Sequence, residues 1–534
     1  MVVLRRAREK GIRLPTGQAP DCWNYFGATV FQPRAGLNHN VMYLDLASLY
    51  PNLMRALNVG PDTIVGTQAD LEASEYTQDQ CYWSYIDTRE VYHLEKGESY
   101  RDFTDGEYKM VYDPHASNSK LKWKDDPQPE RCYYLKPTIK EGFLRETVQE
   151  LIDLKYQYEG TMYEAVKRIV NSIYGYNAYL TERTSSRLAD WRIGESITLA
   201  GRKVIQYSAQ KAVDMLSDQV DGEVYIAIGD TDGCGLCWPQ APTRDVMSNY
   251  VEDIVTYLNG PGYDEFMEDT FGIDETDHYQ EIENESYAPS LFVPQDFDAT
   301  EAQLQEHLEY SRNSDGDVSV GVKKRYAQWI TVDEGDEVDE LKYTGLEAVR
   351  SDVADVTQEA QKYILSLLLR RDFSAAWKEI APYLRDLHDQ ISAGEYPLGE
   401  IAKRGGIRKP PEEYGSASRS PQPIYRGAKY ADEHFDGVTI RAGSKPLTYY
   451  VKSVGDYPST YTAETGENGD VVDAVAVEEP SDLPDDVVID YEKHTRKVLE
   501  EPLTPILKTI GKSWSEVKHG HNQVGFDEFA ATTT

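Results

Sequence analysis

The chain has 534 residues, which is enough for about two to four compact units with a large buried core. Its 40% hydrophobic content excludes a disordered chain, no apolar run approaches the roughly 20 residues that cross a bilayer, and five cysteines are too few for a disulfide framework. Acidic residues outnumber basic ones by 92 to 55, and the resulting net charge of −37 is unusual for a protein that binds nucleic acid.

The first quarter of the chain predicts extended segments and one short helix. An extended stretch with one glycine covers residues 25–30, and an apolar strand ends at Asp45. A short helix is expected over 52–57, directly after Pro51. The tyrosine-rich residues 66–135 predict strands and loops on the edge of a sheet.

The middle of the chain predicts helices and one β-hairpin. Residues 143–175 have helical apolar spacing that is interrupted once, which predicts a helical hairpin, and a further helix is expected over 186–217. Residues 223–238 alternate and turn at an Asp-Gly pair, which predicts a β-hairpin. The acidic residues near 295–318 are expected to form a solvated insertion.

The last third of the chain predicts helices separated by loops. Helical patterning covers 354–387, and a last helix is expected over 490–510. Between them, residues 404–425 predict a basic loop rich in proline and glycine, and residues 463–486 predict an acidic stretch of low complexity.

Asp45 stands at the end of its apolar strand, and the next residues form a tight turn, Leu46–Pro51. The strand fixes the backbone of the carboxylate, and the turn points successive amides at one place. A hard cation such as Mg²⁺ prefers carboxylate, water and phosphate oxygens, so this motif predicts a metal site. The alternative is that Asp45 caps the short helix that follows it.

A second carboxylate motif stands at the tip of the predicted β-hairpin. Asp230 and Asp232 are two residues apart, a spacing that directs side chains to the same side of a strand. The alternative is an ordinary Asp-Gly turn. A calcium loop is excluded because its downstream glutamate and flanking helices are missing.

The second helix of the predicted helical hairpin carries Lys167, Asn171 and Tyr174. Their spacing of i, i+4 and i+7 places them on one helix face. A cation, an amide and an aromatic ring on one face suit a triphosphate and a base. The alternative is a solvated face with one core tyrosine.

Two basic groups stand out in this acidic chain. Lys323-Lys324-Arg325-Tyr326 is compact, and Lys403, Arg404, Arg408 and Lys409 follow in the region of the predicted basic loop. Both groups suit contacts with backbone phosphates, and the alternative for both is a solubilising surface patch.

Taken together and in order, these segments resemble the polymerase portion of family B DNA polymerases. Three motifs carry the resemblance: Asp45–Pro51 matches D-x-x-S-L-Y-P, Lys167–Gly175 matches K-x-x-x-N-S-x-Y-G, and Gly229–Gly233 matches the D-T-D-G form of the second palm motif. Tyr25–Val30 is similar to the Y-x-G-G/A segment that joins the exonuclease and polymerase modules, and Lys323–Tyr326 is similar to the K-K-R-Y element. Three further segments are similar to parts of the thumb: Gly345–Asp352, Asp490–Ile510 and Gln523–Gly525.

The resemblance implies an α+β fold: a palm with an antiparallel ferredoxin/RRM-like sheet, a helical fingers hairpin and a mostly helical thumb. The implied domains are palm over 1–142 and 186–345, fingers over 143–185, and thumb over 346–534.

Carried over residue by residue, the resemblance implies that Asp45 and Asp232 hold two Mg²⁺ ions, with Mn²⁺ as an alternative. Leu46 would also lie at the metals, and Asp230 would be an auxiliary catalytic carboxylate. The reaction would be attack of a primer 3′-hydroxyl on the α-phosphate of a dNTP.

The implied nucleotide site combines backbone amides with side chains of the fingers. The amides of Ser48 and Leu49 would hold the triphosphate together with Lys155, Lys167 and Asn171. In the same site, Tyr50 would be the steric gate against the ribose 2′-hydroxyl, and Tyr174 would lie near the nascent base pair.

The resemblance also implies DNA contacts and two departures from the family. The DNA contacts would come from Lys323, Lys324, Arg325, Tyr326, Lys403 and Arg404. Lys155 stands where the family usually has an arginine, and a lysine lacks the bidentate fork of arginine. The fingers hairpin is also shorter than usual. No exonuclease motif precedes Tyr25, so proofreading is not expected from this chain.

Three interpretations of function follow. The first is a DNA-templated DNA polymerase of a halophile, in which molar salt screens the acidic surface. The second is a catalytically weak or inactive family member that binds primer-template DNA. The third, a different two-metal enzyme on a palm-like fold, is opposed by the Lys167–Gly175 motif.

The expected partners are primer-template DNA, dNTPs, a separate exonuclease subunit and a sliding clamp. No membrane partner is expected. The expected location is the cytoplasm, in association with the nucleoid, because the N-terminus lacks the apolar region of a signal peptide.

Overall fold

The computed structural model describes most of the chain. The described residues are 2–12, 24–104, 106–113, 121–123, 127–177, 179, 186–314, 318–410, 422–455, 457–458 and 473–519. Parts of the predicted basic loop (411–421) and of the acidic stretch (463–472) lie outside these residues, as does the whole predicted tail Gln523–Gly525.

The chain divides into two compact units. The first comprises Met1–Phe31, Met42–Ser286 and Leu308–Asp315, and the second comprises Gln32–Val41, Tyr287–His307 and Gly316–Thr534. None of the described helices is long and apolar enough to cross a membrane.

The central sheet of the first unit contains the predicted β-hairpin. The hairpin strands β8 (Val224–Asp230) and β9 (Gly233–Cys237) pair antiparallel, with Asp230 opposite Gly233. The short strand β11 (Ser311–Arg312) pairs with the outer side of β8. On the other side of β9 lie the ends of two long strands, β1 (Gly36–Leu46) and then β10 (Ile282–Val293), which both contribute to the second unit as well.

The longest helix, α6 (Trp191–Ser217), packs against β8 and β9. Asp190 begins it by accepting a hydrogen bond from the Arg192 amide, the role of an N-cap. More than half of its residues are buried, because α6 contacts β8, β9 and the helices α2 (Leu49–Ala56) and α5 (Gly160–Asn177). The predicted helix at 186–217 is therefore confirmed with a later start.

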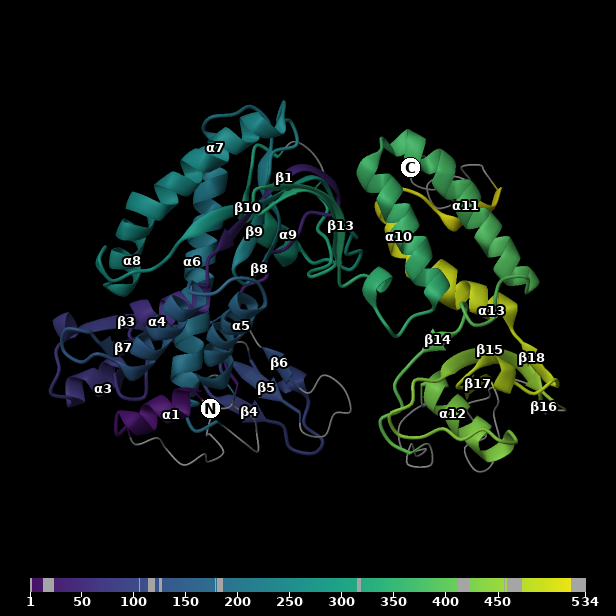
Figure 1. Cartoon of the computed structure of the whole chain (residues 1–534), viewed down its shortest axis with the longest axis horizontal. Helices are drawn as coiled ribbons and strands as arrows, with labels where there is room; N and C mark the ends of the chain where they lie inside the picture. The colour runs from purple at the N-terminus through teal and green to yellow at the C-terminus, as the bar shows by residue number, and fades with distance from the viewer. Residues whose placement is uncertain are drawn as a thin grey trace. The chain divides into compact units, whose positions relative to one another are not determined.

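The predicted helical hairpin is also confirmed. It consists of α4 (Phe143–Lys155) and α5, and Gly160 begins α5 with a φ of +57°, a value that favours glycine. The helix α1 (Val2–Glu9) contacts α4 (Figure 1).

Residues 66–135 were expected at the edge of a larger sheet. Instead, they provide most of the residues of two separate three-stranded sheets. One has the order β2-β7-β3, and the other has the order β4-β5-β6. The strands are β2 (Ile64–Gly66), β3 (Cys81–Ile86), β4 (Val91–His93), β5 (Met110–Tyr112), β6 (Leu121–Trp123) and β7 (Glu130–Leu135), and α3 (Gln68–Ala73) lies between β2 and β3 in the chain. Paired strands satisfy their backbone groups within each small sheet, so neither needs the central sheet.

A helical segment follows the β-hairpin in the first unit. It contains α7 (Arg244–Tyr257), the π-turn η3 (Leu258–Gly262) and α8 (Tyr263–Phe271). The side chain of Thr243 begins α7 by accepting from the Val246 amide.

The second unit contains a β-hairpin, β12 (Tyr326–Asp333) with β13 (Asp336–Thr344), paired antiparallel. In the described part of the expected solvated insertion, residues 295–314 and 318, most side chains are exposed or half-buried. Glu301–Glu309 forms the helix α9, and His307 on it is buried, with Nδ1 3.1 Å from the carbonyl oxygen of Gln32. This helix has one buried residue, and it was not predicted because the segment around it is acidic.

The largest core of the second unit is helical. Two helices, α10 (Asp355–Arg370) and α11 (Phe373–Ala393), lie side by side (Figure 1). The segment α13 (Tyr491–Thr495), η7 (Arg496–Glu500) and α14 (Glu501–Thr509) runs continuously, as predicted for 490–510, and α15 (Trp514–His519) follows. Their apolar faces share one buried cluster that includes Ile364, Leu384 and Leu503.

A five-stranded sheet in the second unit was not predicted. Its central strand β15 (Leu447–Val454) pairs antiparallel with four others: β14 (Lys403–Arg404), β16 (Tyr457–Pro458), β17 (Ala474–Val477) and β18 (Val487–Ile489). The helix α12 (Pro423–His434) packs on β17 (Figure 1). The described end of the predicted acidic stretch thus contains a buried strand.

The buried His494 makes the stability of the second unit depend on pH. Its Nε2 accepts from the Tyr450 amide at 2.8 Å, so this nitrogen must stay unprotonated in the folded state. Burial lowers the pKa of His494 from 6.5 to about 4. Folding therefore favours the neutral form, and its contribution is complete above pH 6.5 and is lost as the pH falls from 6.5 to about 4.

We expect the free energy of unfolding to be ~2 kcal/mol lower at pH 5 than at pH 7.5 because of this histidine alone. Urea unfolding of the wild-type chain and of His494→Gln at both pH values measures it, since a glutamine oxygen can accept from Tyr450 without titrating. An equal pH dependence in the two proteins would contradict this assignment.

Candidate active site

Asp45 and Asp232 are brought together by the backbone. The residue after Asp45, Leu46, donates its amide to the carbonyl oxygen of Asp232 at 2.9 Å. The turn that carries Asp232 contains Thr231 in the left-handed region, with a φ of +64°, and its amide bonds to the carbonyl oxygen of Thr29 at 2.9 Å. The two carboxylates thus project from the end of β1 and from the neighbouring hairpin tip.

The turn after Asp45 is fixed to the start of β10. The amide of Ala47 donates to the carbonyl oxygen of Glu281 at 2.9 Å, and the Asn52 side chain donates to the carbonyl oxygen of Ala47 at 2.7 Å. Ser48, with a φ of +52°, occupies the N-cap position of α2. Asp45 therefore does not cap this helix, and the alternative interpretation of the motif is wrong.

The carboxylate of Asp45 lies in an excess of negative charge. Burial and, in decreasing order, the nearby charges of Asp232, Glu285 and Glu283 together raise its pKa to about 8. The charge of Lys167 acts in the opposite direction. A cation at this position would relieve the repulsion between the carboxylates.

The other two predicted carboxylates reinforce this charge. Burial raises the pKa of Asp232, and the charge of Asp230 raises it further. Asp230 ends β8, forms a β-bridge with Val30 and accepts from the Thr231 hydroxyl at 3.0 Å.

Glu283 and Glu285 stand near the start of β10 and were not among the predicted site residues. A signal was present, because Glu281, Glu283 and Glu285 alternate along a strand and alternate residues share a face. They were not recognised because the surrounding segment is acidic throughout.

The donor set fits a divalent cation such as Mg²⁺. Among the described residues, no group of three or more His, Cys, Asp and Glu side chains is arranged to hold a metal ion. A cation here could take Asp45 and Asp232 as its carboxylate ligands and complete its shell with water and substrate oxygens, as Mg²⁺ prefers.

The predicted nucleotide-binding side chains of α4 and α5 are buried to different extents. Lys167 is half-buried and close enough to Asp45 for its charge to affect the carboxylate, whereas Asn171 on the same helix is exposed. Lys155 is buried, with Nζ 4.5 Å from the centre of the Tyr156 ring.

A pocket of about 450 Å³ joins Lys155 to the turn after Asp45. Its lining includes Ala47, Ser48 and a second buried cation that the sequence analysis missed, Arg55. The Arg55 guanidinium lies 3.6 Å from the centre of the Tyr279 ring, and Nη1 donates to the side-chain oxygen of Asn52 at 3.1 Å.

The predicted gate tyrosine packs against α5 and against α6. The ring centres of Tyr50 and Tyr174 lie 4.5 Å apart. A Cβ atom added at Gly201 would lie 2.9 Å from the Tyr50 ring, so only glycine leaves room for this ring at that point of α6.

The predicted DNA-contacting cations in the second unit are largely paired with acids. Lys323 contacts Glu306 at 2.8 Å, and Arg325 contacts Glu347 at 2.7 Å. Lys324 stands between them with a φ of +59°, and Tyr326 begins β12.

The second basic group lines a separate pocket. Lys403, Arg404 and Arg408 line a pocket of about 600 Å³. Arg404 also contacts Asp355 at 3.4 Å. This pocket could hold an anion.

The chain is similar to curated DNA polymerases over most of its length. It is 22% identical over 456 residues to DNA polymerase 2 of Aeropyrum pernix, covering 85% of this chain and 43% of that protein. It is 25% identical over 396 residues to a DNA polymerase of Archaeoglobus fulgidus, covering 74% and 36%, respectively. It is 23% identical over 411 residues to DNA polymerase II of Escherichia coli, covering 76% and 40%. The chain spans about two-fifths of the length of these curated relatives.

A solved structure with a similar fold is that of the family B DNA polymerase from Pyrobaculum calidifontis. The TM-score is 0.51 at 17% sequence identity, and the match covers 94% of this chain and 49% of that one. A family model described as DNA polymerase family B matches residues 1–234 and 320–450, more than half of the chain, and this match includes Asp45, Lys167 and Asp232. The chain therefore belongs to DNA polymerase family B.

Proposed function

We propose that this chain is a DNA-templated DNA polymerase that adds deoxynucleotides to a primer 3′-hydroxyl. One observation carries the proposal: the backbone hydrogen bond from Leu46 to Asp232 holds Asp45 and Asp232 together where β1 ends and β9 begins, and the charge of Lys167 acts on Asp45. Two carboxylates and one cation on separate elements suit the transfer of a phosphoryl group, and membership of the family supports this reaction class.

In the proposed reaction, Asp45 and Asp232 would hold two Mg²⁺ ions, with Leu46 beside them. Bound Mg²⁺ would make the primer hydroxyl more acidic and balance the charge on the leaving pyrophosphate. The excess of negative charge around Asp45 supports this assignment. Asp230 would add to the electrostatic attraction without being a required ligand.

The triphosphate would be neutralised by residues around the pocket beside Ser48. Lys167 and Asn171 would approach it from α5, the backbone of Ser48 and Leu49 from α2, and Lys155 from α4. Phosphate charge is best stabilised by such preoriented donors and cations.

Arg55 is a candidate to compensate for the lysine at position 155. It lines the same pocket and contributes a guanidinium, which can bind a phosphate through two parallel hydrogen bonds.

Tyr50 would exclude ribonucleotides because its ring fills the space of a ribose 2′-hydroxyl. We expect Tyr50→Ala to raise the use of rNTPs relative to dNTPs by about ten- to a hundredfold, the effect of relieving an overlap that costs about 1–3 kcal/mol. Single-nucleotide incorporation with matched rNTP and dNTP measures this ratio. Tyr50→Phe is the control, and an unchanged ratio in Tyr50→Ala would remove the gate role.

Double-stranded DNA would contact the second unit through Lys323, Lys324, Arg325, Tyr326, Lys403 and Arg404. Two of these cations are engaged by Glu306 and Glu347, so phosphate would have to exchange with those carboxylates. A polymerase adapted to molar salt, where such surface pairs are screened, would make this exchange at low cost.

The proposal is tested by primer extension with the purified chain, Mg²⁺, four dNTPs and a salt series from dilute buffer to molar KCl. We expect a product whose sequence follows the template. The second candidate, an inactive family member that binds DNA, predicts a DNA complex without extension at any salt concentration. The intact pair Asp45 and Asp232 favours the first candidate.

A further inference from the structure

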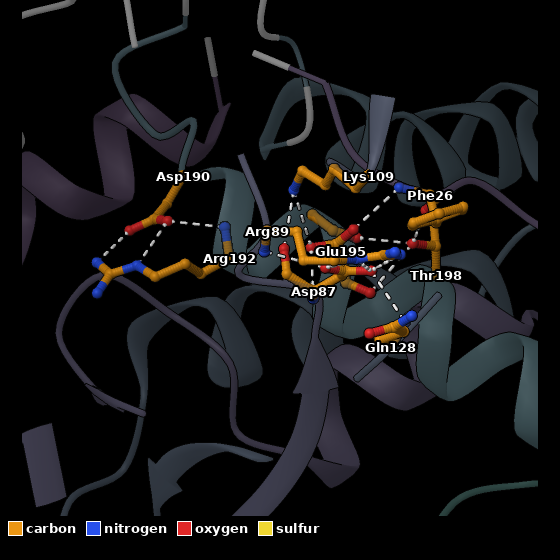
Figure 2. A network of polar contacts seen from close by, with 10 residues as sticks. Phe26, Asp87, Arg89, Lys109, Gln128, Asp190, Arg192, Glu195 and Thr198 are labelled. Carbon is orange, nitrogen blue, oxygen red and sulfur yellow. Dashed lines mark hydrogen bonds and ion pairs between the residues drawn. The ribbon is translucent and has the colours of Figure 1, made fainter. Parts of the chain in front are cut away.

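A buried ion pair lies under the N-terminal segment of the first unit. The carboxylate of Glu195, on α6, lies 3.6 Å from the ammonium of Lys109, and neither side chain is exposed to solvent (Figure 2). Lys109 also donates to the carbonyl oxygen of Asp87 at 2.9 Å and lies 4.6 Å from the centre of the Trp191 ring. Burying two charges is costly, so the polar atoms of this pair need hydrogen-bond partners within the protein.

Glu195 uses both carboxylate oxygens on backbone amides. One accepts from the Phe26 amide and the other from the Asp87 amide, each at 3.0 Å (Figure 2). The Asp87 carboxylate is in turn held by Arg89 at 2.7 Å and by the Gln128 amide at 2.9 Å. Glu195 is therefore a fixed point to which the chain at Phe26 is attached.

Helix α6 holds the other side of Phe26 as well. The Thr198 hydroxyl donates to the carbonyl oxygen of Phe26 at 2.6 Å (Figure 2). Both backbone polar groups of this residue are thus fixed by one turn of α6, and the position of the preceding residue, Tyr25, is fixed with them.

The ring of Tyr25 lies on Gly194 of the same helix. A Cβ atom at Gly194 would come within 2.9 Å of the ring, closer than such contacts allow. The Tyr25 hydroxyl lies 3.5 Å from the hydroxyl of Tyr174, whose ring is 4.5 Å from that of Tyr50. Tyr174 therefore contacts both of the other tyrosines.

Two glycines of α6 leave room for the rings of Tyr25 and Tyr50. Gly194 receives Tyr25, and Gly201 receives Tyr50. Residues seven apart lie on the same face of a helix, two turns from each other. One helix face thus sets the positions of Tyr25 and Tyr50, and the attachment through Glu195 defines where Tyr25 lies along it.

We propose that Glu195 is a positioning residue for sugar selection, acting through Phe26 and Tyr25 on the rings of Tyr174 and Tyr50. This proposal rests on the proposed polymerase function and on Tyr50 as the gate. If Tyr25 no longer holds Tyr174 in place, the Tyr50 ring can move aside when a ribose 2′-hydroxyl enters. Discrimination between dNTPs and rNTPs then falls.

Glu195→Gln tests the proposal, because glutamine keeps the shape but replaces one acceptor oxygen by a donor. We expect the ratio of rNTP to dNTP incorporation to rise about three- to tenfold, the effect of one lost buried hydrogen bond. The KM for rNTPs should fall while kcat for dNTPs changes little. A merely structural role would reduce the active fraction, so it would lower kcat for both substrates and leave the ratio unchanged.

Gly194→Ala and Tyr25→Phe test the same path without altering the ion pair, in case Glu195→Gln does not fold. Gly194→Ala displaces the Tyr25 ring, and Tyr25→Phe removes its hydroxyl, so both should raise the same ratio. The matched control is Asp190→Asn: this carboxylate begins the same helix and pairs with Arg192 at 2.8 Å. Its ratio should equal that of the wild type.

The outcomes are distinguishable from a failure of the proposed function. A wild-type chain that extends no primer refutes the polymerase proposal. A wild-type chain that extends primers, with folded Glu195→Gln and Gly194→Ala variants that discriminate as it does, refutes the positioning role alone.

Discussion

Replacing Asp45 by asparagine is expected to abolish most primer extension, with a loss of about 10³-fold or more. The substitution keeps the size of the side chain but removes the charge that would attract the metal ions. Loss of a single preoriented electrostatic group typically costs about 10²–10³-fold, and a shared metal ligand should cost at least as much. Asp232→Asn should have an effect of the same size, and the double variant should lose little more, since the two act as a unit.

A control must remove a carboxylate of the same unit without touching the site. Asp253 is exposed on α7, and Asp253→Asn should extend primers as the wild type does. Because Asp45 and Asp232 are held together in the folded chain against mutual repulsion, each single variant should also be at least as stable as the wild type toward urea. A folded Asp45→Asn variant that retained wild-type extension would exclude Asp45 from the chemistry.

Lys109→Met is expected to lower the free energy of unfolding by about 3–5 kcal/mol. Methionine fills a similar volume but leaves the Glu195 carboxylate buried without its cation. Burial already raises the pKa of Glu195, and the charge of Lys109 opposes that rise. Removing the lysine should therefore push the carboxyl group toward its neutral form.

Urea unfolding followed by tryptophan fluorescence measures the effect, since Trp191 lies beside the Lys109 ammonium. The control is Lys203→Met. Lys203 also lies on an aromatic ring, with Nζ 4.5 Å from the centre of Tyr85, and should cost far less because no buried carboxylate depends on it in this way. A similar loss in both variants would show that side-chain packing, rather than charge, explains the effect.

The elements that the sequence predicted well are those that local patterns determine. The hairpin β8–β9 follows from an apolar run, an Asp-Gly pair and a second apolar run. The helices α4, α5 and α6 follow from a helical apolar period over many turns. The adjacency of Asp45 and Asp232 was inferred from the family resemblance, and the backbone bond from Leu46 to Asp232 agrees with it.

The features that were missed depend on contacts between distant residues. The five-stranded sheet of the second unit unites strands of two to eight residues from positions 403 to 489, and short strands carry weak local signals. Glu195 and Lys109 look like ordinary surface residues in the sequence, and only the fold reveals that both are buried. No sequence period distinguishes a charged residue that will be paired from one that will be solvated.

Acidic composition also obscured the site itself. Glu283 and Glu285 stand in a segment with many carboxylates, so their alternation did not stand out from its surroundings. Arg55 was overlooked for a related reason: an arginine near the end of a short helix normally faces solvent, whereas this one is buried on the Tyr279 ring.

The most direct test of the central claim is Mn²⁺ binding, measured by electron paramagnetic resonance, in a complex with a dideoxy-terminated primer-template and the matching dNTP. We predict that the wild-type chain binds Mn²⁺ in this complex, that Asp253→Asn binds it equally, and that Asp45→Asn and Asp232→Asn each lose most of the binding. Undiminished Mn²⁺ binding by both folded active-site variants would contradict the claim that these two aspartates hold the metals.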